Sequence, residues 1–106
     1  MATDKIVLEG YFGTSYPFSI YVNDSYWNEV PGVYFVTKKD SLNKYMPLYV
    51  GITENLKQRF SNHHKLQAFQ RQGWTHLGFL YEPDEVKRRA IERDLLLNYC
   101  WECNDS

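Results

Sequence analysis

Residues 31–60 read PGVYFVTKKDSLNKYMPLYVGITENLKQRF. Two apolar runs, 33–36 and 47–52, are rich in β-branched and aromatic residues and flank a polar segment, which predicts two strands. The segment between them is too short for a parallel crossover, so we expect the two strands to pair antiparallel. Thr53 is then the predicted N-cap of a helix over 54–71.

Outside this stretch the chain predicts three more strands and a second helix. Residues 5–12 and 16–22 are rich in β-branched and aromatic residues on either side of a Gly-Thr-Ser turn, which indicates a β-hairpin. Residues 74–81 form another apolar run, and Pro83 followed by acidic residues predicts a helix over about 84–99. This order predicts an α+β fold in which helices flank a small central antiparallel β-sheet with an extra N-terminal β-hairpin.

Length and composition favour one soluble domain. The 106 residues are enough for one modest core, and 43% hydrophobic with 24% charged residues is typical of a folded domain. We expect residues 1–30 to form the hairpin extension and residues 31–106 the rest of one compact domain. No apolar run approaches ~18 residues and no leader-like segment opens the chain, so we expect a cytoplasmic protein without a membrane partner.

The net charge of −1 conceals an uneven distribution. Residues 38–71 carry seven basic and two acidic residues, whereas the flanking segments 1–37 and 72–106 are both net acidic. A positive stretch inside an acidic chain is typical of a surface that faces phosphates, although a solvated helix face would carry the same charges. The residues predicted to bind nucleic acid are Lys38, Lys39, Lys44, Lys57, Lys65 and Arg71.

Each predicted helix turns one ionisable side chain toward the sheet. The apolar arc of the first helix holds Leu56, Phe60, His63 and Leu66, with Arg59 in its middle. The apolar arc of the second holds Ile91, Leu95, Leu96 and Tyr99, with Glu92 among them. Buried lone charges are costly, which leaves two interpretations open. One is a buried Arg59–Glu92 salt bridge without chemistry, and the other is a phosphate-binding arginine and a metal-binding carboxylate facing one pocket.

Two tyrosines on the neighbouring predicted strands complete the pattern, because side chains of adjacent strands meet. The chain resembles the GIY-YIG nuclease family through the tripeptides Gly32-Val33-Tyr34 and Tyr49-Val50-Gly51 and through Arg59, His63, Glu92 and Asn104, which follow in the family's order. The resemblance covers about residues 31–105 and leaves residues 1–30 outside.

The resemblance implies a metal-dependent endonuclease that hydrolyses phosphodiester bonds in DNA, with RNA as a further substrate class. Such hydrolysis needs an activated water, charge neutralisation on the phosphate and help for the leaving oxygen. Tyr34 is expected to orient or deprotonate the water, which requires a phenol pKa below its usual value of about 10. Arg59 would bind the phosphate, and His63 would relay the proton. Glu92 would hold one Mg²⁺ or Mn²⁺ ion.

Two further positions have supporting roles in this resemblance. Tyr49 would hydrogen-bond the phosphate or hold Tyr34, and Asn104 would fix the last helix or the surroundings of the scissile phosphate. Only about 30 N-terminal residues remain for substrate recognition. We therefore expect little sequence specificity, with a homodimer or a protein partner as possible sources of more.

Two other readings differ in class. The first is a catalytically inactive module on the same fold that binds nucleic acid or a partner. The second is a zinc-stabilised domain, in which Cys100 and Cys103 would be joined by two ligands from His63, His64 and His76. Two reduced cysteines without a metal are the simpler expectation for an intracellular chain.

Overall fold

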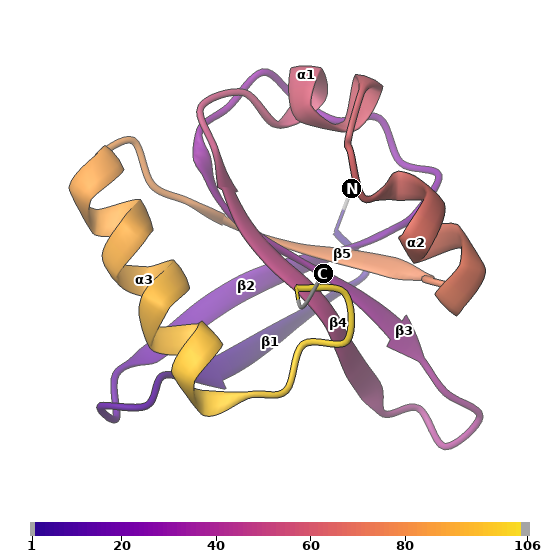
Figure 1. The fold of residues 1–106 in the computed structure, drawn as a ribbon, viewed down its shortest axis with the longest axis horizontal. Helices are drawn as coiled ribbons and strands as arrows, with labels where there is room; N and C mark the ends of the chain where they lie inside the picture. Colours follow the sequence, from indigo (N-terminus) through magenta and orange to yellow (C-terminus); the bar gives the residue numbers. More distant parts are fainter. Residues whose placement is uncertain (1, 105–106) are drawn as a thin grey trace.

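A five-stranded antiparallel sheet is the centre of the fold in the computed structural model, which describes residues 2–104 (Figure 1). Its strands follow the spatial order β1-β2-β5-β3-β4, so that β5 lies between the N-terminal hairpin and the β3–β4 pair. The strand bounds are β1 Asp4–Glu9, β2 Ser15–Val22, β3 Gly32–Lys39, β4 Tyr45–Thr53 and β5 His76–Tyr81. The predicted α+β fold, its antiparallel sheet and its N-terminal hairpin are confirmed.

Three helices accompany the sheet: α1 Leu56–Ser61, α2 Leu66–Gln72 and α3 Glu85–Asn98. The last agrees with the predicted helix over 84–99, and its N-cap is Asp84, whose carboxylate accepts from the backbone N–H of Val86. Within residues 2–104 no helix is long and apolar enough to cross a membrane.

The prediction of one helix over 54–71 is wrong, because the chain turns between α1 and α2. Asn55, not Thr53, is the N-cap, and its side chain accepts from the backbone N–H of Gln58. The first helix ends at Ser61, and the turn that follows buries His63 between the helices and the sheet. The helical spacing of apolar residues continues across this turn, so periodicity alone did not reveal it.

The two faces of the sheet carry separate cores, because alternate residues of β3 point in opposite directions. On one face α3 packs through Leu95, together with Phe35 and Trp101. On the other face α1 and α2 pack through Leu56 and Phe69. Leu96, predicted in the buried arc of the second helix, is instead exposed, and the buried side of α3 carries Arg88 and Asp94 beside Leu95.

The N-terminal hairpin is fastened to α3. The buried carboxylate of Asp94 accepts from the hydroxyl of Tyr16 at 2.6 Å and from the backbone N–H of Phe12 at 3.1 Å. Further along the helix, the amide of Asn98 donates to the carbonyl of Glu9 at 2.8 Å. The segment at the hairpin turn therefore holds the C-terminal half of α3 in place.

Candidate active site

Tyr34 lies at the centre of a buried aromatic cluster formed by the β3–β4 pair. It faces Gly51 across the two strands and stacks on the ring of Tyr49, with ring centroids 6.1 Å apart. A Cβ at Gly51 would lie 2.7 Å from the Tyr34 hydroxyl and 2.9 Å from the Tyr49 ring. A side chain at position 51 would therefore push the two tyrosines out of place, which gives a steric reason for this glycine.

His63 fixes the hydroxyl of Tyr34 from the turn between α1 and α2. The Nε2 atom of His63 lies 2.7 Å from the Tyr34 hydroxyl, and its Nδ1 accepts from the backbone N–H of Lys65 at 2.9 Å. Burial, followed by the charges of His64 and Arg59, lowers the pKa of His63 to about 4, so the ring is neutral near pH 7. With Nδ1 as acceptor, the proton of the neutral ring sits on Nε2 and is donated to Tyr34.

This geometry corrects the expected chemistry of the pair in the free protein. Burial, followed by the charge of Tyr49, raises the pKa of Tyr34 far above 10, and the opposing effect of Arg59 is smaller. The expected lowering of the phenol pKa is therefore wrong for the free protein, because the ring is only 1% exposed. The neutral His63 ring, whose Nε2 already carries a proton, is placed to donate to Tyr34 and not to accept its proton.

The lowered pKa of His63 predicts a pH-dependent stability. The unfolded chain binds this proton near pH 6.5 and the folded chain near pH 4, so stability is full above pH 6.5 and falls between these values. We expect a loss on the order of 2 kcal/mol, allowing for partial solvent screening. Urea unfolding from pH 4 to 7 should show a flatter profile for His63→Gln than for the wild type.

The matched control for this measurement is His64→Gln, because His64 is exposed and stacks on His63. It should keep most of the wild-type slope. Parallel profiles for all three proteins would show that His63 does not carry the effect.

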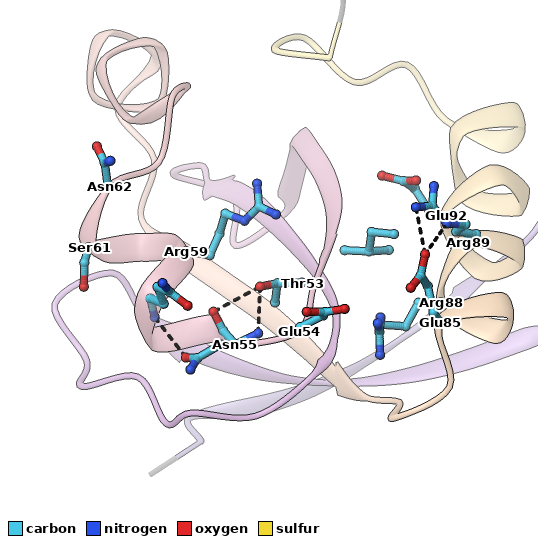
Figure 2. Close-up of a pocket in the computed structure, with 12 residues that line it drawn as sticks. Thr53, Glu54, Asn55, Arg59, Ser61, Asn62, Glu85, Arg88, Arg89 and Glu92 are labelled. Atoms are coloured by element: carbon cyan, nitrogen blue, oxygen red, sulfur yellow. Dashed lines mark hydrogen bonds and ion pairs between the residues drawn. The ribbon is translucent and has the colours of Figure 1, made fainter.

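An open cleft of about 750 Å³ separates α1 from α3 (Figure 2). Arg59 on α1 and Glu92 on α3 face it from opposite walls, and both are half-buried. Neither Tyr34 nor Tyr49 lines the cleft, but the ring of Tyr34 packs edge-to-face on Phe60, the residue after Arg59, with ring centroids 5.2 Å apart. The cleft thus has a cation and a carboxylate on facing walls, and the tyrosine cluster adjoins the wall that carries Arg59.

The salt-bridge interpretation of Arg59 and Glu92 is wrong. Within residues 2–104 the one ion pair joins Arg89 to Glu85 at 2.9 Å on the surface of α3. Burial is the largest influence on Glu92 and raises its pKa, while Arg89 and then Arg59 partly oppose this. Arg59 and Glu92 share a solvent-filled cleft and not a closed pair, so each is available to a ligand.

Asn104 lies away from the cleft, at the edge of the sheet. Its amide oxygen accepts from the backbone N–H of Val50 at 2.9 Å, and its amide nitrogen donates to the carbonyl of Val50 at 3.1 Å. The side chain therefore pairs with edge strand β4 as another strand would, between Tyr49 and Gly51. Its two expected roles, fixing the last helix or the surroundings of the scissile phosphate, stay predictions, and its observed contacts support the strand that carries Tyr49.

The predicted nucleic-acid-binding residues lie outside the cleft. Three belong to the β3–β4 hairpin, and others lie on or next to α2, on the side of the molecule away from α3 (Figure 1). Lys57 is on α1 and exposed. None of the six lines the cleft. That these six residues bind nucleic acid stays a prediction. Such binding would require a nucleic-acid strand that extends from the cleft across α1 toward α2.

Sequence reasoning missed several polar residues of the cleft, of which Arg88, Asn55 and Thr53 are examples. Arg88 is buried, although arginine is rarely buried without a partner. The available signal was its position four residues before Glu92, which places both side chains on one face of a helix.

The donor set of the cleft fits a weakly held divalent cation. Within the described chain no group of three or more His, Cys, Asp or Glu residues could enclose a metal, and this includes the cysteines proposed for zinc. Cys103 is instead buried in the core, and Cys100 is exposed. Glu92 has no ion-pair partner among residues 2–104. An unpaired carboxylate in an open cleft is typical of Mg²⁺ sites, where water and substrate supply the other ligands.

Comparison with known proteins agrees with this geometry. The family model for the GIY-YIG catalytic domain matches residues 30–91, which is more than half of the chain. No curated protein and no solved structure matches. The chain belongs to the GIY-YIG family, a family of nucleases. The match includes both tyrosines and Arg59 and ends one residue before Glu92.

Proposed function

We propose that this protein is a metal-dependent endonuclease that hydrolyses phosphodiester bonds in DNA. The observation that carries the proposal is the placement of Arg59 and Glu92 on opposite walls of one cleft, unpaired with each other, with Tyr34 packed against Phe60, the residue next to Arg59. Membership of a nuclease family supports it. A fold kept only for binding would have no need to hold a free carboxylate opposite a free arginine.

Three residues of this chain have separate roles toward the substrate. Arg59 binds the non-bridging oxygens of the phosphate and neutralises charge that develops on them, which its planar fork of donors suits. The Tyr34 oxygen accepts a hydrogen bond from His63, keeps one lone pair to accept a hydrogen bond from the attacking water, and its own O–H donates a hydrogen bond to an oxygen of the phosphate. Tyr49 stacks on Tyr34 and limits its movement.

Glu92 is the residue that would hold a divalent cation, Mg²⁺ or Mn²⁺. When bound, such a cation supplies charge stabilisation for the leaving oxygen. Tyr34 is a neutral phenol in the free protein, so it positions the attacking water through hydrogen bonds when the substrate enters. Burial raises the pKa of Glu92, and a cation bound at this carboxylate would favour its ionised form.

We propose that the enzyme has low sequence specificity, acts on flexible or branched DNA and is cytoplasmic; the small size of the chain supports the low specificity. RNA would be a further substrate class. A second copy of the chain or a protein partner would add specificity. The experiment that tests the function is incubation of purified protein with duplex, single-stranded, flapped and branched DNA and with RNA, in Mg²⁺ and in EDTA.

We expect cleavage in Mg²⁺ that EDTA abolishes, and Tyr34→Phe should lower its rate by more than about tenfold, or 1.4 kcal/mol of barrier. The variant removes one hydroxyl and keeps the packed ring, so its free energy of unfolding should change little. Wild-type cleavage by Tyr34→Phe would show that the hydroxyl does not position the water. Absence of cleavage on every substrate would favour the inactive binding module.

A further inference from the structure

Arg88 is a buried cation without a counter-charge. Its side chain is 3% exposed, and within residues 2–104 no carboxylate lies within ion-pair distance of it. An unpaired charge removed from water is costly, so such groups are retained where an anion joins them. The neighbouring Arg89 differs, because it is exposed and already paired with Glu85.

The hydrogen bonds of Arg88 leave one edge of its guanidinium free. Its Nη1 donates to the carbonyls of Glu82 at 3.1 Å and Pro83 at 2.9 Å, just before α3 begins. Its Nε is buried and has no partner. The Nε and Nη2 donors form one edge of the planar group, the edge that binds carboxylates and phosphates with two parallel hydrogen bonds.

The free edge belongs to the wall of the cleft. Arg88 lines the cleft one helical turn before Glu92, and Figure 2 shows its side chain directed from α3 into the space that Arg59 faces from α1. The carboxylates of Glu54 and Glu85 also line this space, but Glu85 is held by Arg89. An oxygen bound at Nη2 would lie on the edge that also carries Nε, and a small shift of the buried side chain would let Nε donate to it as well.

We propose that Arg88 binds a second phosphate of the nucleic-acid strand, next to the phosphate held by Arg59. The proposal rests on the proposed function and names the substrate group that this part of the cleft takes, a backbone phosphodiester. Two carbonyl groups hold the guanidinium in place before substrate arrives, which lowers the entropy cost of binding. The subsite fixes the direction of the strand relative to Glu92.

The test measures binding of a fluorescent 12-nucleotide single-stranded DNA in EDTA, where no metal-dependent cleavage occurs. Arg88→Gln should weaken binding by about tenfold, as expected for a charged hydrogen-bonded contact. Arg89→Gln is the matched control, because it removes the same charge from the same helix, and it should weaken binding less than about threefold. Equal losses in the two variants would overturn the subsite.

A second measurement does not depend on a variant that folds. The Nε–H resonance of Arg88 in the ¹H–¹⁵N spectrum of the wild type should shift on titration with the same DNA and saturate with the binding curve. A resonance that stays unchanged at saturation would overturn the proposal. Inorganic phosphate is the second probe: saturation at the same concentration as DNA would mean a site for a free anion and would overturn the strand subsite.

The experiments distinguish an absent Arg88 subsite from an absent nuclease activity. A protein that cleaves in Mg²⁺ but loses equal affinity in Arg88→Gln and Arg89→Gln keeps the proposed function and lacks this subsite. A protein that cleaves nothing but shows the Arg88-specific loss has the subsite without the reaction.

Discussion

Glu92→Gln is expected to lower metal-dependent cleavage below detection, by about a thousandfold or more, because it removes the unpaired, half-buried carboxylate that faces Arg59 across the cleft. The fold should remain, since Glu92 makes no ion pair in the described chain and its amide analogue has the same shape. The measurement pairs cleavage rates in Mg²⁺ with urea unfolding. Burial raises the pKa of Glu92, so a neutral amide at this position should be at least as stable.

Glu85→Gln is the matched control for Glu92→Gln. It removes the same charge from the same helix and the same cleft, but from a side chain that is exposed and paired with Arg89. Its cleavage rate should stay within about threefold of wild type. A binding titration with Mn²⁺ gives a readout apart from activity, and Glu92→Gln should lose the bound ion. Wild-type cleavage by Glu92→Gln would exclude Glu92 as the metal ligand.

Arg59→Ala is expected to lower the cleavage rate by about a hundredfold or more, the effect of losing a charged contact in the transition state. Its free energy of unfolding should change by less than about 1 kcal/mol, because Arg59 is half-buried and has no ion-pair partner within residues 2–104. Arg59→Lys should recover little activity, since an ammonium group cannot reproduce the two parallel donors of the guanidinium.

The stability measurement separates this role from a structural one. If Arg59 were needed to neutralise a buried Glu92, Arg59→Ala would cost several kcal/mol, and Arg59→Met combined with Glu92→Leu would restore stability. Arg89→Ala controls for general loss of positive charge at the cleft and should cleave within about threefold of wild type. A strongly destabilised Arg59→Ala protein that cleaves normally per folded molecule would overturn the phosphate-binding role.

The sequence was enough for the elements whose signals are local. The apolar runs around Tyr34 and Tyr49 gave the β3–β4 pair, and Pro83 with the acids after it gave the start of α3. The inward positions of Arg59 and Glu92 followed from helical spacing, although Arg59 lies on a helix of only six residues. These are properties of neighbouring residues, which a short stretch of chain contains.

The rest depended on contacts between distant segments. The helix break after Ser61 follows from the contact of His63 with Tyr34, 29 residues earlier in the chain. The insertion of β5 between the hairpin and β3 is likewise a long-range pairing that no local pattern carries. Arg88 is a third case, because its burial depends on hydrogen bonds to two carbonyl groups before α3, and its position in the helix gives no sign of these partners.

The attachment of the hairpin to α3 means that the N-terminal segment supports the wall of the cleft that carries Glu92. Residues 1–29 lie outside the matched family segment, yet Asp94, two positions after Glu92, is satisfied by groups from this segment. A chain cut at residue 30 would leave this carboxylate buried without its donors and would expose the edge of β5 that β2 covers. The helix that bears Glu92 therefore takes its anchorage from sequence that the family model does not describe.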